Sequence, residues 1–413
     1  MKVLVVSLYF PPAGGPGVHR PLKLAGHLTH LGFEVDVLAP DDPKWVHRDA
    51  SLRVPDGVTV HRARNLGPRA RIPGQELYGR SGLDRLRRRA AIAARGLLVP
   101  DASVLWAVTA IPAALRIVRR EAIDVVLTTS PPGSVHLVGA AVRARTRARW
   151  VADLRDPIVG HAHRRREIRG EPALAHLVAR RADAVVAASA GTADWMERFA
   201  PRRAVHVVEN GCDFDDFDGL EYRRGERFRI THTGSFFGRR NPRAFLEALA
   251  RTDGDVVARF VGGLPPRHRA WVAEQGLGDR VEVLEFIPRA EALALQRDSE
   301  ANLLLVPEAE GRGRAVLTAK VFEYLAAERP ILAVVPPDGH AAELMRETGA
   351  GLVVAPDDVD AIAEALADLE RRWREGTLDG SPLTPELRAR LDRRAGAERL
   401  AGILRDVAGN GGS

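Results

Sequence analysis

Short apolar runs alternate with amphipathic stretches along most of the 413-residue chain. The runs are rich in Val, Ile and Leu, as expected for strands buried on both faces. Lys2–Leu8 is followed by a Gly- and Pro-rich loop, a helical pattern over Val18–Leu31 and a second apolar run at Glu34–Ala39. This strand–helix–strand order predicts a parallel sheet with crossover helices.

The same alternation predicts further strands in the first half of the chain, at Asp124–Thr128, Arg149–Leu154, Ala184–Ala188 and Ala204–Val208. A second series predicts strands at Phe228–Thr233, Val256–Val261, Val281–Glu285, Ala301–Val306, Ile331–Val335 and Gly351–Val354. We therefore predict an α/β fold of two tandem doubly wound, Rossmann-like domains, over residues 1–218 and 219–384. A last charged helix, Pro385–Ala408, has no strand after it and could return to the first domain, so we treat 385–409 as a separate segment.

The composition is that of a globular protein, with 45% hydrophobic and 28% charged residues. No apolar run approaches the roughly 20 residues that span a bilayer. The single cysteine, Cys212, excludes an internal disulfide and suits a reducing cytoplasm. We interpret His161 and His163, in an Arg-rich stretch, as solvated, and we predict neither a metal site nor a bound cofactor.

Charge is distributed unevenly between the two halves of the chain. Residues 1–200 hold 31 Lys and Arg against 18 Asp and Glu, whereas the remainder holds 30 against 36. A basic half could contact anionic lipid, an anionic substrate or nucleic acid. Within it, Arg80–Leu98 interleaves arginine with leucine, which fits either a helix on the inner face of an anionic membrane or a solvated basic face.

Glu323 is the first candidate for ligand binding. It lies in a helical pattern that ends near Pro330 and is followed by the predicted strand Ile331–Val335. A carboxylate at the mouth of a parallel sheet can accept two hydrogen bonds from a ribose diol. The alternative is a solvated glutamate on a surface helix.

Two glycine-containing loops follow the first strand of each predicted domain. The first contains Gly14, Gly15 and Gly17 and opens a helix, so its amides could face a phosphate, or it could be only a tight turn. The second pairs Gly234 with Arg239 and Arg240. Guanidinium groups suit a diphosphate, although the loop could also be solvated.

A dinucleotide site is a rival interpretation of the first loop. The loop lacks the G-x-G-x-x-G spacing, and Pro16 removes a backbone amide that such a site needs. Asp41 and Asp42 nevertheless follow the second strand at a tolerable distance. A nucleotide-linked oxidoreductase therefore stays open.

Polar side chains also end two strands of the first half. Asp153, Arg155 and Asp156 end one strand, and Ser130 ends the preceding one. Strand ends line the crevice of an open α/β sheet, so these groups could stabilise a developing positive centre or transfer a proton. They could equally form an ion-paired turn.

Together these motifs resemble the glycosyltransferase family 4 group of GT-B enzymes, in a bacterial envelope-sugar branch, over nearly the whole chain. The segments that carry the resemblance are Leu8–Gly17 with Arg20, Phe33–Leu38, Thr129–Pro132, Val151–Pro157, Asn210–Asp213 with Phe217, and Glu323–Ala326. The resemblance implies a retaining, metal-independent transfer of a sugar from a nucleotide-diphosphate sugar. It implies that Glu323 binds the donor ribose and that Arg240, with Arg239, neutralises the diphosphate. Arg20 and Ser130 are expected on the acceptor side.

The sequence also departs from the family pattern. The first glutamate of the Glu–seven residues–Glu motif falls at Ala315, and Lys320 is the closest polar substitute on that helix. Ser235 replaces a usual arginine, and Asn241 replaces a usual lysine. The cleft histidine of many relatives is absent, which makes Asp156, with Asp153 second, our candidate catalytic carboxylate.

We therefore predict a cytoplasmic hexosyltransferase that acts in polysaccharide biosynthesis on a lipid-linked, polysaccharide-precursor or small-molecule acceptor. Arg80–Leu98 is its candidate for peripheral contact with the inner face of an anionic membrane. Nucleic acid is not expected as a partner. The alternatives are an NAD(P)-dependent oxidoreductase and a catalytically inactive GT-B protein that binds anionic membrane or nucleic acid.

Overall fold

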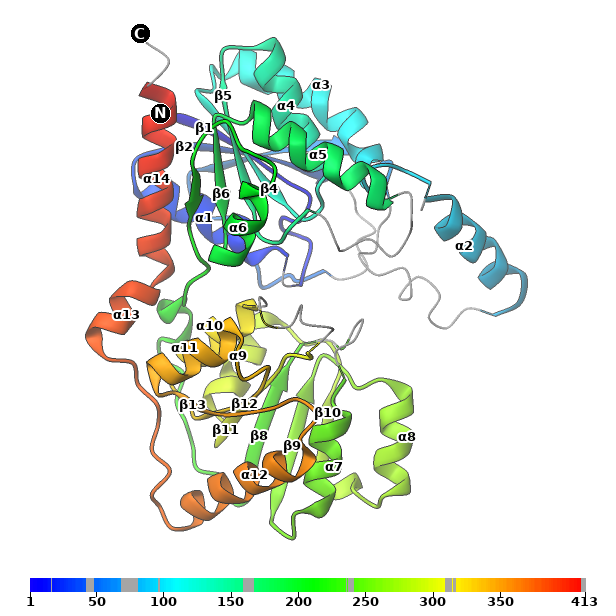
Figure 1. The fold of residues 1–413 in the computed structure, drawn as a ribbon, viewed down its shortest axis with the longest axis vertical. Helices are drawn as coiled ribbons and strands as arrows, with labels where there is room; N and C mark the ends of the chain where they lie inside the picture. The colour runs from blue at the N-terminus through cyan, green and yellow to red at the C-terminus, as the bar shows by residue number, and fades with distance from the viewer. Residues whose placement is uncertain are drawn as a thin grey trace. The chain divides into compact units, whose positions relative to one another are not determined.

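The computed structural model describes residues 1–15, 17–41, 48–67, 81–95, 97–158, 167–234, 236, 241–308, 314 and 317–409. The chain divides into two compact units (Figure 1). The first unit contains Met1–Asn210 together with Gly396–Ser413, and the second contains Gly211–Ala395.

The first unit is built on a seven-stranded parallel sheet in the order β3-β2-β1-β4-β5-β6-β7. Its strands are β1 (Lys2–Ser7), β2 (Glu34–Asp41), β3 (Val58–Arg64), β4 (Val125–Ser130), β5 (Arg149–Leu154), β6 (Ala184–Ala187) and β7 (Val205–Val207). Its helices are α1 (His19–His30), α2 (Gly82–Arg95), α3 (Val104–Arg120), α4 (Val135–Arg145), α5 (Glu167–Arg181), α6 (Ala190–Glu197) and α14 (Arg393–Gly409).

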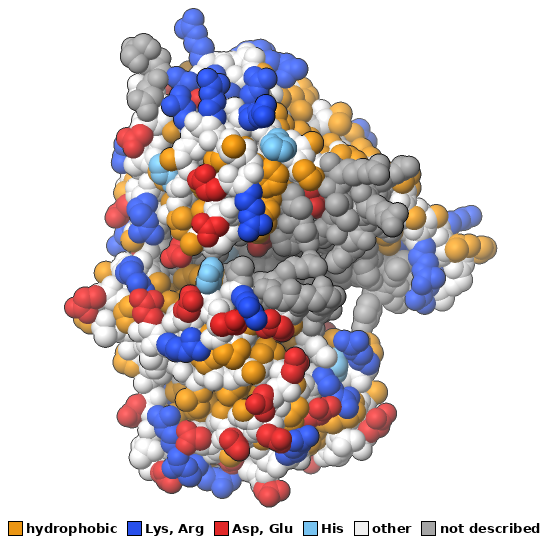
Figure 2. All heavy atoms as spheres, viewed as in Figure 1, with side chains coloured by type: hydrophobic (Ala, Val, Ile, Leu, Met, Phe, Trp, Pro, Cys, Tyr) orange, Lys and Arg blue, Asp and Glu red, His pale blue; other side chains and the backbone are white. Residues whose placement is uncertain are grey.

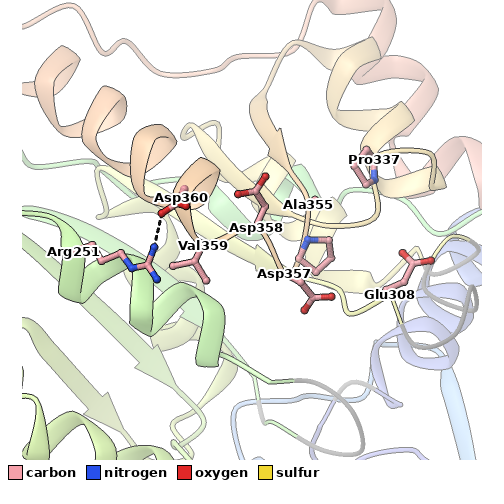
Figure 3. A pocket seen from close by; sticks show the side chains of 9 residues that line it. Arg251, Glu308, Pro337, Ala355, Asp357, Asp358, Val359 and Asp360 are labelled. Atoms are coloured by element: carbon pink, nitrogen blue, oxygen red, sulfur yellow. Dashed lines mark hydrogen bonds and ion pairs between the residues drawn. The ribbon is translucent and has the colours of Figure 1, made fainter.

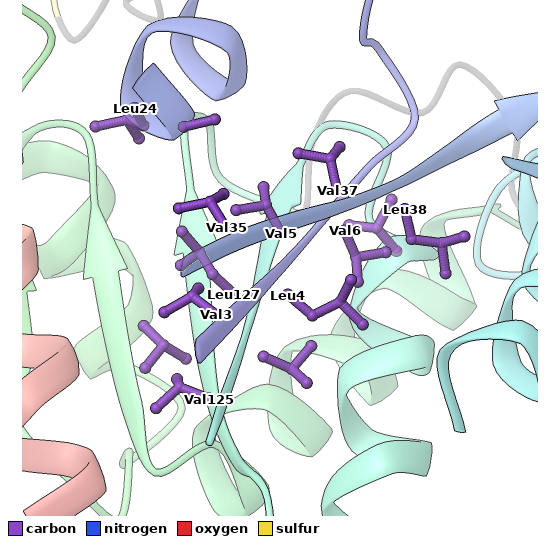
Figure 4. Packing of buried hydrophobic residues seen from close by; sticks show 14 of the residues in the cluster. Val3, Leu4, Val5, Val6, Leu24, Val35, Val37, Leu38, Val125 and Leu127 are labelled. Atoms are coloured by element: carbon purple, nitrogen blue, oxygen red, sulfur yellow. The ribbon is translucent and has the colours of Figure 1, made fainter. Parts of the chain in front are cut away.

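The core of this unit lies on both faces of β1. Within the sheet, β1 is a central strand. Its Val3 and Val5 pair in register with Val35 and Val37 of β2 along one edge, and with β4 along the other edge (Figure 4). Burial of both faces explains why β1 is a continuous apolar run. Helices α3, α4 and α5 pack side by side against the sheet, and α1 covers its other face (Figure 1). Leu400 of α14 joins the same core.

The second unit has a six-stranded parallel sheet in the order β10-β9-β8-β11-β12-β13. Its strands are β8 (Phe228–Thr233), β9 (Val256–Val261), β10 (Val281–Leu284), β11 (Ala301–Leu305), β12 (Ile331–Val334) and β13 (Gly351–Val354). Its helices are α7 (Arg243–Arg251), α8 (Pro266–Glu274), α9 (Arg289–Arg297), α10 (Ala319–Ala326), α11 (His340–Thr348), α12 (Val359–Arg374) and α13 (Pro385–Leu391), with short 3-10 helices at Phe214–Phe217 and Gly278–Arg280.

Side-chain alternation along β11 separates two cores. Leu303 and Leu305 pack with α7, α8 and α12, whereas Leu304 packs with α9, α10 and α11. Helices therefore cover both faces of this sheet as well, and the predicted fold of two doubly wound α/β units is confirmed.

The last helix differs from its sequence prediction. Instead of one helix over Pro385–Ala408, the chain forms α13 and α14, separated at Asp392, whose backbone is extended. The reason is a competing backbone pairing. Cys212 N donates to Leu391 O at 2.7 Å, and Arg393 N donates to Cys212 O at 3.0 Å. A continuous helix would use these groups internally.

Candidate functional site

The strand order of the second unit reverses between β8 and β11. Connections leave these neighbouring strands in opposite directions. In open α/β sheets, ligands bind outside the carboxyl ends of the strands at such a point. Gly234 follows β8 there, and α10 follows β11.

Helix α10 presents two charged side chains at this edge. Lys320 and Glu323 are three residues apart, so they lie on the same side of the helix. The positions between and after them, Val321, Phe322 and Tyr324, are buried in the core. Packing of one side of the helix therefore fixes where the ammonium and the carboxylate point.

Lys320 is held against the end of β8. Its Nζ lies 3.3 Å from Nε2 of His232. Nδ1 of His232 lies 2.9 Å from Leu303 O, and because a carbonyl only accepts, Nδ1 carries the proton and Nε2 accepts from the lysine. A Cβ at Gly234 would lie 2.4 Å from Cε of Lys320, and the φ of Gly234 is +113°. Glycine is thus required for the lysine to lie here.

Glu323 is oriented from α9. Arg289 Nη1 donates to its Oε1 at 2.6 Å. Gln296 Nε2 reaches its Oε2 only at a long 3.4 Å. The carboxylate is 20% exposed, so Oε2 keeps capacity to accept hydrogen bonds from a ligand.

Arg289 was not identified from the sequence. It joins Glu323 to the segment after the unit boundary, because its Nη2 donates to Asp216 at 2.9 Å and lies 4.0 Å from Asp213. Burial alone would lower the pKa of Arg289, but Glu323, Asp216 and Asp213 together raise it. The guanidinium therefore stays charged and fixes the rotamer of Glu323. No spacing in the sequence links positions this far apart.

The corresponding edge of the first unit also gathers charged residues, but they bind one another. Arg20 forms a bidentate pair with Asp153, at 3.0 Å from Nε to Oδ2 and 2.7 Å from Nη2 to Oδ1. Thr129 Oγ1 donates to the same carboxylate at 2.7 Å. Burial alone would raise the pKa of Asp153, but Arg20, with help from Thr129 and Arg155, holds it below its usual value. The side chains are 4% and 0% exposed.

Arg20 additionally ties the sheet to the end of the unit. Its guanidinium donates to Val208 O at 3.0 Å and to Asn210 Oδ1 at 3.2 Å. The Arg20 side chain is itself buried, and these hydrogen bonds join β5 to the segment that follows β7. We therefore assign Arg20 and Asp153 a structural part, and the prediction of a catalytic carboxylate rests on the half-buried Asp156.

Arg155 connects two loops at this edge. It donates to Ser130 O at 2.6 Å and to Gly17 O at 2.8 Å, with a longer contact to Pro131 O. Ser130 itself is buried, and its Oγ lies 3.4 Å from Asp153 O. Arg155 thus shapes the loops that end β1 and β4.

The three glycines of the first loop are favoured for different structural reasons. A Cβ at Gly14 would approach Asp49 to 3.1 Å, and one at Gly17 would approach Tyr9 to 3.0 Å. Gly15 has a φ of +94° and open space around it. Close packing and backbone conformation explain all three, and a phosphate role for them stays a prediction.

Other predicted residues lie outside the described ranges. These are Arg239, Arg240, Pro16, Ser235, Ala315, His161 and His163. Asn241 is described, and its Oδ1 accepts from the backbone N–H of Arg243 at 3.0 Å, at the start of α7.

A separate open hollow of about 600 Å³ lies in the second unit (Figure 3). Glu308, Asp357, Asp358 and Asp360 line it, and Arg251 pairs with Asp360. Its lining shares no residue with the Lys320 and Glu323 group. A lining dominated by carboxylates repels a diphosphate.

Within the described ranges, no three His, Cys, Asp or Glu side chains gather in a way that could hold a metal ion. Each helix in the described part of the chain is too short or too polar to cross a lipid bilayer.

Two family models match the chain. Residues 14–211 match a glycosyl transferase 4-like domain, and residues 227–371 match the glycosyl transferases group 1. The first match contains β2 to β7, and the second contains all six strands of the second sheet. The fold and these domains define a glycosyltransferase of the GT-B type, and the chain belongs to this class of enzymes. A nucleotide-linked oxidoreductase is thereby set aside. No curated protein matches the sequence.

Solved structures agree with the fold. Sucrose-phosphate synthase from Thermosynechococcus elongatus is 16% identical, with a TM-score of 0.68 over 98% of each chain. Anabaena HepE in complex with UDP-glucose is 16% identical, with a TM-score of 0.66 over 98% of this chain and all of that one. UDP-GlcNAc 2-epimerase from Methanocaldococcus jannaschii is 12% identical, with a TM-score of 0.53 over 98% and 99%. The epimerase illustrates that the fold alone does not decide the reaction.

Proposed function

We propose that the chain is a retaining family 4 glycosyltransferase that moves a hexosyl unit from a UDP-sugar to a lipid-linked or polysaccharide-precursor acceptor. The observation that carries the proposal is the pair of Lys320 and Glu323 on one side of α10, at the switch point of the second sheet. HepE has been solved with UDP-glucose, which makes UDP the first nucleotide to test.

Each side chain has a specific part in donor binding. The ribose hydroxyls donate to Glu323, whose rotamer Arg289 fixes. The Lys320 ammonium binds diphosphate oxygens beside the glycine at the end of β8. Arg240 and Arg239 add guanidinium donors in the proposal.

The reaction breaks the bond between the anomeric carbon and the diphosphate oxygen. The acceptor hydroxyl oxygen forms the new bond on the same face of the sugar, and its proton passes to the departing diphosphate. Negative charge grows on the departing diphosphate, so cations placed before the reaction lower the barrier. The proposed cations are Lys320, Arg239 and Arg240, and the proposal assigns no metal ion to the reaction. Asp156 is the proposed polar catalytic group, and the carboxyl edge of the first sheet is the proposed acceptor side.

Donor turnover tests the proposal directly. The purified chain is incubated with a panel of UDP-sugars, UDP release is followed by chromatography, and the anomeric configuration of the released or transferred sugar is read by proton NMR. We expect at least one donor to be used with retention, and turnover to fall in Glu323→Ala but not in Glu282→Ala. Glu282 is the matched control because it also pairs with an arginine, Arg259, at 2.7 Å.

The outcomes separate the remaining alternatives. An inverted product contradicts the retaining mechanism. Absence of both donor binding and turnover with every sugar nucleotide favours the catalytically inactive GT-B protein instead. Unchanged turnover in Glu323→Ala contradicts the assignment of the donor site.

A further inference from the structure

Helix α2 of the first unit carries its apolar residues on the outside. Leu83 is 73% exposed and Leu86 is 63% exposed. The half-buried positions are instead Arg88 and Ile92, four residues apart. A surface helix of a globular protein normally turns its apolar stripe inward, whereas the described side chains of α2 are all exposed or half-buried, its two leucines among the exposed ones. Figure 1 shows α2 projecting from the rest of its unit.

Exposed apolar side chains concentrate in this part of the chain. Of the eight large hydrophobic residues that are exposed in the described ranges, six lie between Leu66 and Val108. Leu97 and Val99, directly after the helix, are 58% and 46% exposed. Isolated exposed leucines are ordinary, whereas such a concentration marks a contact surface.

The charges beside the leucines have one sign. Arg85, Arg87 and Arg89 are exposed, and Asp84 is the one acidic residue of α2. Figure 2 shows hydrophobic and basic side chains next to each other where α2 projects. Long arginine side chains can keep their charge in a polar layer while their methylene groups follow apolar neighbours inward.

We propose that α2, with Leu97 and Val99, is the surface by which this protein docks on an anionic lipid bilayer. The leucines enter the boundary of the acyl chains, and the flanking arginines bind the acidic headgroups. Exposed leucines are not explained by nucleic acid, which is bound through phosphate contacts. A neutral apolar partner does not explain the arginines. The proposal does not depend on the donor site, so the two can fail separately.

Vesicle binding measures this directly. The full chain is sedimented with vesicles of phosphatidylcholine alone and with vesicles that contain phosphatidylglycerol. Three variants are compared with the wild type: Leu83→Gln with Leu86→Gln, Arg85→Gln with Arg87→Gln, and Arg180→Gln with Arg181→Gln. The last pair, on α5, is the control for loss of the same charge elsewhere.

We expect binding to the anionic vesicles only, weakened about tenfold or more by each α2 variant and retained by the α5 control. Melting temperatures should stay within a few degrees, because the substituted side chains are exposed. Failure of the wild type to bind would overturn the proposal. So would loss of binding in the arginine variant with no loss in the leucine variant, because docking would then be purely electrostatic.

A site-specific probe adds a direct readout of insertion. The single native cysteine, Cys212, is fully buried, so Leu86→Cys can be labelled selectively with an environment-sensitive fluorophore. We expect a blue shift on addition of anionic vesicles, and none for Phe286→Cys, an exposed position in the second unit. No shift at Leu86→Cys, or a shift with DNA or with protein concentration in place of vesicles, would contradict docking on lipid.

Discussion

The carboxyl edges of the two sheets both carry charged residues, but these residues differ in how deeply they are buried and in how many protein groups they bind. In the first unit, Arg20 and Asp153 form a bidentate pair that is almost entirely buried. In the second, Glu323 keeps one-fifth of its surface exposed, and one oxygen has only a long protein contact. The same kind of position in the same kind of fold thus holds a buried ion pair in one unit and a partly exposed carboxylate, the proposed ribose-binding group, in the other.

The difference shows how charge at a strand end should be judged. A buried charge must be matched by protein groups, and removal of its partner is costly. A charge that is held by one partner and remains partly exposed can bind a ligand. Partner count and exposure therefore separate the two roles better than residue type or position.

Arg20→Met is expected to have the largest effect, because it leaves Asp153 buried without its guanidinium. The free energy of unfolding should fall by about 3–5 kcal/mol. Urea denaturation measures it. Arg259→Met is the control, since its partner Glu282 is 40% exposed and such pairs contribute about 1 kcal/mol or less. A loss below 1 kcal/mol in Arg20→Met would contradict a structural role for the pair.

A fall in pH should reveal how a second buried group of the first unit, the His136 side chain, contributes to stability. His136 is fully buried, with Nδ1 2.8 Å from Thr128 Oγ1, and burial lowers its pKa to about 4. In the unfolded chain its pKa is about 6.5, so between these values the unfolded state binds more protons and stability falls as pH falls. From pH 7 to pH 4.5 the loss should be about 2–3 kcal/mol.

The variant His136→Gln isolates this contribution from the carboxylates, which also titrate. Its unfolding free energy should depend less on pH than that of the wild type over the same interval. Equal slopes in the two proteins would mean that the buried imidazole does not resist protonation.

In the second unit, Arg289→Gln should affect donor binding more than folding. Loss of the guanidinium frees the rotamer of Glu323, and we expect donor affinity to fall about tenfold, a loss of about 1.4 kcal/mol. Arg393→Gln is the matched control. Arg393 also pairs with Asp213, at 2.8 Å, but it does not contact Glu323. Calorimetric titration with UDP compares them. Equal losses in both variants would indicate a general structural defect.

Much of the fold could be predicted because buried parallel strands are continuous apolar runs. The run Ala301–Val306, for example, forms β11 (Ala301–Leu305). Strand β3 was not predicted, because it lies at the sheet edge and most of its positions are exposed or half-buried, which weakens the apolar signal. The break at Asp392 could not be predicted either, since it depends on backbone pairing with Cys212.

The candidate site divides in the same way. Glu323 was predicted because a local pattern places it on a helix before a strand. Lys320 was predicted through the family resemblance, as the polar residue of that helix closest to the missing first glutamate. Arg289 and the pairing of Arg20 with Asp153 depend on contacts between residues 34 and 133 positions apart. Such contacts arise only from the tertiary fold, so local patterns do not contain them.

The most direct test of the account is the coupling between Glu323 and the ribose of the donor nucleotide. Calorimetric titrations compare UDP with 2′,3′-dideoxy-UDP, on the wild type and on Glu323→Ala. We predict that loss of the ribose hydroxyls weakens binding to the wild type by about 10- to 150-fold, as expected for hydrogen bonds to a charged group, and changes binding to Glu323→Ala little. Equal weakening in both proteins would contradict the assignment of Glu323 as the ribose-binding residue.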